Sequence, residues 1–282
     1  MNKSELRKAL AAAVRAAEAA GRLMRENLRA TKKVNARTSH DIKLELDVRC
    51  QKRIEKSLRQ AFPRISLLGE EGDSGSINEA LRWVVDPIDG TVNFAYGIPH
   101  ACVSIALQQR SDACQAASDA KPFRTRKSAP VTRHPSHVTI LGVVHDPFTD
   151  ETWTAIRGEP TRLNGHVASV SNRKQLQECI VCVGFAKSRH SLERALPQFI
   201  WMARRVRKMR MMGAAALGLA YVASGRFDAY VERGVSLWDV AAGGLLIECA
   251  GGKFWTEPVP GSEKIRMVAS NGLIHHRIPQ PR

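Results

Sequence analysis

Several features of common protein classes are absent from this chain of 282 residues. No P-loop, Gly-rich dinucleotide fingerprint or Ser, His and Asp grouping follows a suitable strand. Aromatic residues make up only 6% of the chain, and no RNP-type aromatic pattern, zinc finger or homeodomain signature accompanies its basic residues. These absences argue against the usual nucleotide-binding and serine-hydrolase mechanisms and against the standard nucleic-acid modules.

Long apolar runs are also absent. The longest charge-free apolar region, residues 211–225, is too short and too rich in Gly and Ala to span a bilayer. Residues 6–28 place apolar side chains at helical spacing with charges between them, which predicts an amphipathic core helix and not a signal peptide. We therefore expect a cytoplasmic protein that does not associate with a membrane.

The cysteines do not form a metal-binding pattern. There are six, scattered along the chain, and the single C-x-x-C, Cys179 and Cys182, falls in a predicted strand. A strand would direct the two side chains to opposite faces. With no second pair, we interpret the cysteines as small buried hydrophobic residues and expect no zinc site.

Positive charge is in large excess. The 43 Lys and Arg outnumber the 27 Asp and Glu, and the net charge is +16. Basic residues concentrate at 121–133 and 203–210, and the second segment predicts a half-buried helix with a solvated basic face. Such an excess attracts anionic substrates and also permits nonspecific association with nucleic acid.

The segment WVVDPIDGTVNF, which begins at Trp83, joins a strand to two acids. Its apolar, β-branched start predicts a buried strand, which Pro87 and Gly90 stop. Asp86 and Asp89 emerge together at the end of that strand and would repel each other unless a hard cation lies between them. Mg²⁺ is the natural candidate.

Gly90 and Thr91 follow these acids and offer backbone N–H groups with little side-chain obstruction. Such concave amide clusters favour phosphate oxygens, and Thr91 adds a hydroxyl. Asp, Pro and Gly are also ordinary turn residues, so taken alone this segment is equally typical of a plain turn.

Two further acids lie at predicted element ends. Glu70 comes just after the apolar run 65–68, and Asp239 begins a helix that Gly251 and Gly252 end. Taken singly, Glu70 is typical of a solvated loop acid and Asp239 of a partner for the helix dipole.

The stretches GEE, WVVDPIDGTVNF and WDVAAGGLLIECAGG, in that order, resemble the inositol monophosphatase family over nearly the whole chain. The first signature of that family is matched at every defined position and the second nearly so. The resemblance implies a lithium-sensitive phosphatase with two or three Mg²⁺ ions. By position, it assigns metal binding to Glu70, Asp86, the Ile88 carbonyl, Asp89 and Asp239.

The resemblance also places Asp47 near a third, weaker Mg²⁺ site. Family members commonly carry Thr beside this acid, whereas this chain has Leu44 and Leu46. Asp47 is equally well placed to cap a helix over 48–61, and both interpretations stay open.

The implied reaction is hydrolysis of a phosphate monoester by metal-activated water, with Glu70 and Thr91 as catalytic residues. A haloacid dehalogenase mechanism is disfavoured, because two residues separate Asp86 from Asp89 where that class has one. Myo-inositol 1-phosphate is the expected substrate; fructose 1,6-bisphosphate, 3′-phosphoadenosine 5′-phosphate and histidinol phosphate are alternatives. A basic scaffold that binds nucleic acid or protein on the same fold is a second hypothesis.

The resemblance further implies a homodimer and a set of substrate-binding positions. Glu232 would accept hydrogen bonds from vicinal hydroxyls, although it could instead form a surface salt bridge, and the alanines could simply pack a helix. The substrate-binding positions are Ile88, Asp89, Gly90, Thr91, Gly213, Ala214, Ala215, Glu232 and Asp239.

The expected fold is mixed α and β, in layers that alternate helix, sheet, helix, sheet, helix. Residues 1–170 would form an α+β domain whose antiparallel sheet carries Glu70 and Asp86. Residues 171–282 would form a smaller α/β domain that supplies Asp239. A segment at 108–138 without periodicity predicts a flexible insertion, and RGEPTRLNG predicts an altered turn.

Overall fold

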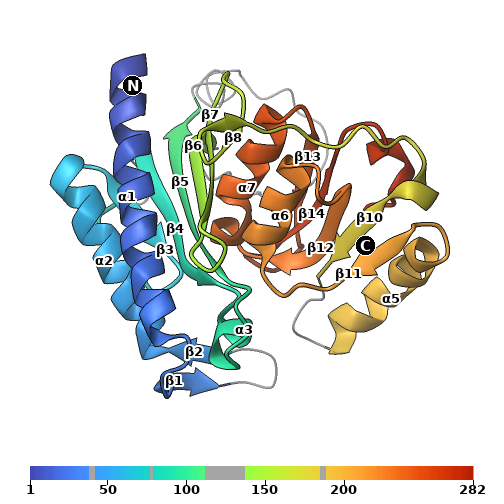
Figure 1. Cartoon of the computed structure of the whole chain (residues 1–282), viewed down its shortest axis with the longest axis horizontal. Helices are drawn as coiled ribbons and strands as arrows, with labels where there is room; N and C mark the ends of the chain where they lie inside the picture. Colours follow the sequence, from blue (N-terminus) through green and yellow to red (C-terminus); the bar gives the residue numbers. More distant parts are fainter. Residues whose placement is uncertain (38–41, 77–78, 112–136, 185–188, 282) are drawn as a thin grey trace, which may run out of the picture.

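The computed structural model describes residues 1–37, 42–76, 79–111, 137–184 and 189–281. It has the expected five layers (Figure 1). Helices α1 (Lys3–Asn27) and α2 (Glu45–Ala61) cover one face of the first sheet. Helices α6 (Ala215–Ala223) and α7 (Leu237–Cys249) fill the space between the sheets, and α5 (Arg189–Ala203) lies outside the second.

The first sheet has seven strands in the order β3-β4-β5-β6-β7-β8-β9. The β3–β4 pair is parallel and the others are antiparallel, so the expectation of an antiparallel sheet was wrong for the strand that leads to Glu70. The strands are β3 (Ser66–Gly69), β4 (Leu81–Asp89), β5 (Cys102–Arg110), β6 (His137–Asp146), β7 (Glu151–Ile156), β8 (Arg162–Leu163) and β9 (His166–Val167).

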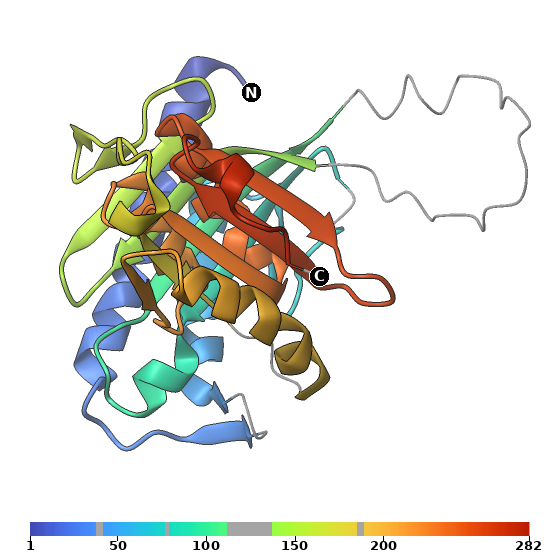
Figure 2. The ribbon, with the colours of Figure 1, turned by 90° about the vertical axis from the view of Figure 1, so that its right-hand side faces the viewer.

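The second sheet has five strands in the order β11-β10-β12-β14-β13, and its first three are parallel. Figure 2 looks onto the side where α5 lies and shows this helix in front of the strands. The strands are β10 (Ile180–Val183), β11 (Lys208–Arg210), β12 (Ala229–Val235), β13 (Lys253–Pro258) and β14 (Ile265–Ser270).

Short elements complete the described chain. They are the hairpin of β1 (Val34–Arg37) and β2 (Ile42–Leu44), the helix α3 (Thr91–Ala95), and the 3₁₀ turns η1 (Leu176–Glu178) and η2 (His275–Arg277). Asn164 and Gly165 join β8 to β9 with φ of 48° and 82°. Two positive φ angles in a two-residue loop are typical of a type I′ hairpin turn, which Asn-Gly favours.

Helix α1 confirms the amphipathic helix expected near the N-terminus. Its buried side chains, however, are mostly alanines and not the leucines from which the helix was predicted. The buried face consists of Ala9, Ala12, Ala13, Ala16, Ala17, Ala20, Gly21 and Met24. Small side chains let the helix lie close to its neighbours, and it packs on α2 and β6. Among the described helices, none is both long enough and apolar enough to cross a membrane.

Of the five cysteines in the described regions, all free thiols, Cys50, Cys102, Cys179 and Cys182 are buried as expected, whereas Cys249 is half-buried. Cys179 packs with the outer residues of the second sheet, and Cys182 packs on the opposite side with α6 and α7. The two side chains therefore cannot share a ligand.

Two sequence expectations about segments need correction. Strand β5 runs through Arg110 and β6 starts at His137, so the ends of the expected insertion 108–138 are paired strand residues, and positions 112–136 lie outside the described residues. The basic segment 203–210 is not a helix. Helix α5 ends at Ala203, and after a turn the chain forms the edge strand β11, in which Met209 is half-buried between exposed cations. The division at residue 170 stays a prediction.

Candidate active site

The two aspartates of the WVVDPIDGTVNF motif lie in one strand, β4, which continues past Pro87 to Asp89. The expectation that Pro87 ends the strand was wrong. The pairing with β5 is interrupted between Asp86 and Asp89, so that Pro87 and Ile88 form a bulge. Inside the bulge, the Ile88 N–H donates to Asp86 Oδ1 at 3.0 Å and the Thr91 hydroxyl donates to the Ile88 carbonyl at 2.9 Å.

Gly90 follows the bulge with φ of 92° and precedes α3. A Cβ at this position would lie 2.9 Å from the His100 carbonyl oxygen and 3.1 Å from Ala214 Cβ. Glycine is therefore required both by the backbone conformation and by the space available.

The Asp89 carboxylate is buried and accepts hydrogen bonds from backbone N–H groups at the N-terminus of α6. Asp89 Oδ1 accepts from the Ala215 N–H at 2.9 Å, and Oδ2 accepts from the Ala216 N–H at 2.7 Å. This role of Asp89 was missed, because the sequence does not reveal that residues 126 positions apart meet. The predicted pocket residues Ala214 and Ala215 are thereby placed beside the motif, since their helix begins on its second aspartate.

Asp239 stands in the first turn of α7, as predicted. Its Oδ2 accepts from the Ser236 N–H at 2.7 Å. The Ser104 hydroxyl on β5 donates to the Trp238 carbonyl at 3.2 Å, so the start of α7 is attached to the strand next to Asp86. Gly251, with φ of 88°, follows Ala250, the C-cap residue of the helix, so the helix ends where predicted.

Two further acids approach Asp86: Glu70 follows the end of β3, and Asp47 lies in the first turn of α2. The Glu70 N–H donates to the Val85 carbonyl at 3.2 Å, next to Asp86. Asp47 is in the third position of α2, where its Oδ2 accepts from the Leu44 N–H at 2.7 Å. Asp47 therefore does cap the N-terminus of this helix, as one of the two interpretations held. The helix, however, begins at Glu45 and not at Val48.

These acids act electrostatically on one another. Burial raises the pKa of Asp86 well above its ordinary value, and so do the charges of Glu70, Asp89, Asp239 and Asp47, in that order. Burial and the charge of Asp239 raise the pKa of Asp89 to about 7, even though the backbone N–H groups of α6 act in the opposite direction. Acids from three other parts of the chain, together with the neighbouring Asp89, therefore converge on Asp86, which is only 2% exposed.

This donor set is chemically suited to a divalent cation, because carboxylate and carbonyl oxygens are the ligands of Mg²⁺ and a cation would lower the pKa values that the acids raise in one another. In the described parts of the chain, however, no three His, Cys, Asp or Glu side chains are already arranged around a common metal position. Asp47, Asp89 and Asp239 each turn a carboxylate oxygen to a backbone N–H instead.

Glu232, on β12, borders the site from the second sheet. It accepts a hydrogen bond from the Tyr230 hydroxyl, and its carboxylate lies so close to Gly184 that any Cβ there would overlap it. Burial raises the pKa of Tyr230, and the charges of Glu232 and Asp89 raise it further. Tyr230 therefore holds the predicted polyol-binding acid and is within range of the charge of Asp89, a role that sequence reasoning missed.

Gly213, another predicted pocket residue, has φ of 73° and lies against the Asn93 amide. Asn93 Nδ2 donates to the carbonyl oxygens of His100 and Met212, at 2.9 and 2.8 Å. Asn93 was not assigned a role from the sequence, although it is part of the motif. It joins the loop before β5 to the loop before α6, and so fixes Gly213 beside α3.

Comparison with known proteins identifies a family that this chain resembles. The model of the "Inositol monophosphatase family" matches residues 5–126 and 134–277. The chain is 34% identical over 278 residues to the "Nus factor SuhB" of Xylella fastidiosa, covering 95% of this chain and 91% of that protein. It is 36% identical over 225 residues to the "Inositol-1-monophosphatase" of Rhizobium meliloti, covering 78% and 73%.

Solved structures of similar proteins share the fold. The "extragenic suppressor protein suhB from Bartonella henselae" superposes with a TM-score of 0.79 at 29% identity, over 95% of both chains. The "Inositol monophosphatase from Anabaena" superposes with a TM-score of 0.75 at 30% identity, over 95% of this chain and 92% of that one.

Proposed function

The chain belongs to the inositol monophosphatase family, and from this we propose that it hydrolyses myo-inositol 1-phosphate to inositol and phosphate with Mg²⁺ as cofactor. The observation that carries the proposal is the convergence of Glu70, Asp89, Asp239 and Asp47 on the buried Asp86. Buried carboxylates that raise one another's pKa are costly to a fold, which makes them markers of a functional site.

We assign the ions to oxygen ligands of this cluster. Two Mg²⁺ ions would be held by Glu70, Asp86, the Ile88 carbonyl, Asp89 and Asp239, and a third, weaker one would lie near Asp47. When bound, Mg²⁺ supplies positive charge that makes hydroxide accessible near neutral pH and stabilises the leaving alkoxide.

The residues of the chain would orient the reaction. Glu70 and Thr91 would hold the attacking water and remove its proton. Thr91 is suited to this relay because its hydroxyl already donates to the Ile88 carbonyl and can accept from a water at the same time. The backbone N–H groups of Gly90 and Thr91 would bind phosphate oxygens and stabilise the charge that develops there.

The alcohol part of the substrate would lie toward β12 and α6. Glu232 would accept hydrogen bonds from vicinal hydroxyls, and Gly213, Ala214 and Ala215 would line the same space, together with Asp89 and Asp239. Support comes from Tyr230, whose hydroxyl donates to Glu232 and whose pKa is raised by the charges of both Glu232 and Asp89.

Phosphate release from a panel of monoesters, with Mg²⁺ and with EDTA, tests this function. We expect Mg²⁺-dependent turnover with the highest kcat/KM on myo-inositol 1-phosphate. A higher kcat/KM on fructose 1,6-bisphosphate, 3′-phosphoadenosine 5′-phosphate or histidinol phosphate would support the proposed reaction and show that the proposed substrate is wrong. Turnover that is absent or independent of Mg²⁺ across the panel would contradict the proposal.

A second candidate function is binding of nucleic acid or protein by a basic surface. Two observations favour it: the exposed cations of residues 204–210, and the relatives named "Nus factor SuhB". Binding of an RNA oligonucleotide measured over a range of salt concentrations tests it. A steep fall of affinity with salt would indicate several phosphate contacts, and no measurable binding in low salt would exclude nucleic-acid binding.

We also propose that the protein is a cytoplasmic homodimer inhibited by lithium, as the family resemblance implies. Light scattering on the purified chain tests the dimer, and titration of the Mg²⁺-dependent activity with LiCl tests the inhibition.

A further inference from the structure

A polar hollow lies at the start of β10, outside the residues of the acidic centre. It has a volume of about 580 Å³ and is lined by Asn172, Arg173, Glu178, Ile180 and Arg207. Ile180 is the first residue of β10 and pairs with Lys208, which begins the parallel strand β11. Gly184, which lies against Glu232, follows the last residue of β10, so Glu232 and the hollow lie at opposite ends of this strand.

Arg173 is held in place by a buried acid. Its Nη1 donates to Asp228 Oδ1 at 3.0 Å, and the Asp228 side chain is fully buried. The Ile180 N–H donates to Asp228 Oδ2 at 2.7 Å, and the Ser171 hydroxyl also donates to this carboxylate. Asn271 Nδ2 donates to the Arg173 carbonyl at 2.8 Å, so both the backbone and the guanidinium of Arg173 are fixed.

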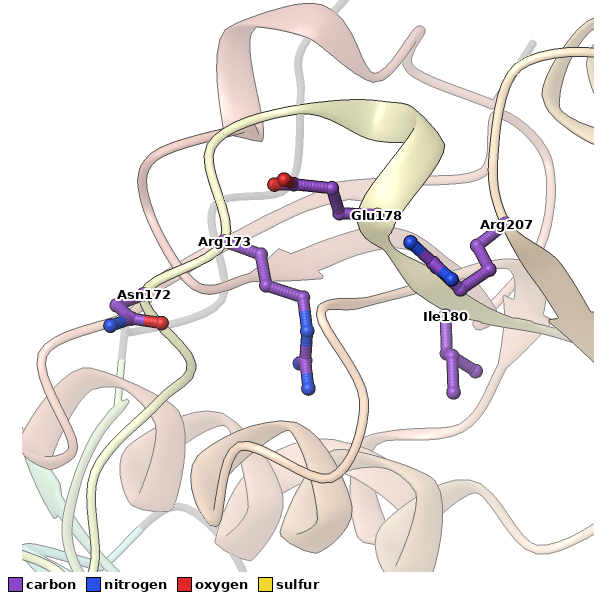
Figure 3. A pocket seen from close by; sticks show the side chains of 5 residues that line it. All are labelled: Asn172, Arg173, Glu178, Ile180 and Arg207. Carbon is purple, nitrogen blue, oxygen red and sulfur yellow. The ribbon is translucent and has the colours of Figure 1, made fainter.

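The guanidinium of Arg173 is nevertheless available to a ligand, because 40% of its side chain is exposed. Arg207 approaches from the loop before β11, and its backbone N–H donates to the Cys179 carbonyl at 3.0 Å. Figure 3 shows Arg173 and Arg207 extending into the hollow from two sides, with the Ile180 side chain below Arg207 and the Glu178 carboxylate directed away from Ile180.

The surroundings add positive charge. Lys174 is exposed next to Arg173, and Arg277 Nη1 donates to the Lys174 carbonyl and to Gln175 Oε1, both at 3.2 Å. Glu178 is the one acid that lines the hollow in the described chain. A fixed guanidinium, that of Arg173, with the exposed guanidinium of Arg207 lining the same positively charged opening, is suited to recognise phosphate oxygens.

We propose that this hollow binds the phosphoryl group of a small phosphorylated metabolite of mononucleotide size, at a site distinct from the acidic centre and independent of the activity proposed above. Arg173 and Arg207 bind the phosphate, and Asn172 and Glu178 meet polar groups of the remainder. Ile180 provides an apolar contact. A volume of about 580 Å³ is within the range of pockets that enclose ligands of this size.

Adenosine 5′-monophosphate is a suitable probe, titrated calorimetrically into the full chain in EDTA. Without divalent cations the carboxylates of the acidic centre repel phosphate, so the hollow is measured alone. We expect saturable binding at one site per chain. Arg207→Gln should weaken it roughly ten- to hundredfold, as expected for loss of a charge-assisted hydrogen bond to phosphate. Arg207 is exposed and holds no buried acid, so its replacement leaves the fold intact.

Arg204→Gln is the matched control, because Arg204 is exposed in the same turn and does not line the hollow. It should leave the affinity within about twofold, whereas Arg173→Lys, tested with a melting curve to confirm folding, should weaken it. The proposal is overturned if the unaltered chain shows no saturable binding, or if Arg204→Gln and Arg207→Gln weaken binding equally. Binding of a single-stranded oligonucleotide without binding of the mononucleotide would also overturn it.

Discussion

The hydroxyl of Tyr230 donates a hydrogen bond to the carboxylate of Glu232, two residues further along β12. Residues two apart in a strand share a face, and this face is turned toward α6 and α7. Since the raised pKa of Tyr230 keeps its hydroxyl protonated, Tyr230 acts as a permanent donor. Together with Gly184, which leaves room for the carboxylate, it determines where Glu232 lies.

Replacing Tyr230 with Phe removes this donor and keeps the ring in the core. We expect KM for myo-inositol 1-phosphate to rise about three- to tenfold, the usual effect of one lost hydrogen bond. The kcat should change little, because Glu232 would contact the alcohol and not the reacting phosphate. Steady-state kinetics on myo-inositol 1-phosphate and on 4-nitrophenyl phosphate, which lacks vicinal hydroxyls, measure the difference.

Tyr96→Phe is the control for this variant, since Tyr96 is 68% exposed and lies outside the core. It should leave both substrates unaffected. Equal losses on the two substrates in Tyr230→Phe would mean that Tyr230 supports the fold and does not position Glu232.

The metal-free protein should lose stability as the pH rises from about 4 to 7. The folded chain holds a proton on Asp89, whose pKa is raised to about 7 mainly by burial and by Asp239, whereas the unfolded chain releases it near the ordinary aspartate value. The folded state thus binds more protons in this window, and the free energy of unfolding falls with increasing pH. Thermal melting in EDTA across this range measures the fall, and Mg²⁺ should reverse it at pH 7 and above. A metal-free melting temperature that rises steadily from pH 4 to 7 would contradict the expected sign.

Asp86→Asn tests two effects of the acidic cluster: the repulsion that destabilises the metal-free protein and the binding of Mg²⁺ that activity requires. Asp86 is the acid on which the other charges converge, so its neutralisation should raise the melting temperature of the metal-free protein at pH 8. It should also abolish the stabilisation by Mg²⁺ and reduce kcat/KM by at least about a hundredfold. Asp89→Asn is a less clean test, because Asp89 also accepts the N–H groups at the start of α6. If the Asp86→Asn variant keeps its turnover, the assignment of Asp86 as a metal ligand of the active site is wrong.

The parts of the fold that follow from local patterns were predicted correctly. The strand before Asp86 follows from an apolar, β-branched run, and the ends of α7 follow from an acid in its first turn and Gly251 after its last. The errors arose where distant contacts decide the conformation. Pro87 remains in β4 because a bulge takes up the interrupted pairing, and the basic segment after Ala203 becomes a strand because β10 offers its edge.

The sequence allowed the acids of the candidate site to be predicted, but it did not allow the contacts between them and the rest of the fold to be predicted. The motifs contain Glu70, Asp86, Asp89 and Asp239, but no local pattern reveals that α6 begins on the Asp89 carboxylate. Tyr230 had no sequence signal either, because a tyrosine in an apolar strand is typical of a core residue. Its role becomes visible only when its partner is known.

A row of small residues determines how closely α7, and with it Asp239, approaches the first sheet. Ala106, Gly142 and Ala155 lie opposite one another on β5, β6 and β7, and Ala242 of α7 rests on Gly142. A Cβ at Gly142 would lie 2.9 Å from the Ala242 carbonyl oxygen and 3.1 Å from its Cα. Because these are backbone atoms of a helix, no side chain can rotate to relieve the contact.

Gly142→Ala should therefore move α7 outward, lowering the free energy of unfolding by about 1–3 kcal/mol, as overpacking does. Because Asp239 is in the first turn of that helix, kcat should fall at temperatures where the variant is still folded. Urea unfolding and steady-state kinetics measure the two effects. Gly158→Ala is the control: Gly158 has φ of 86° and open space around it, so only its backbone strain changes, and it should lose about 1 kcal/mol of stability without losing activity. If Gly142→Ala unfolds at the same urea concentration as the unaltered chain, close contact between β6 and α7 does not set the position of Asp239.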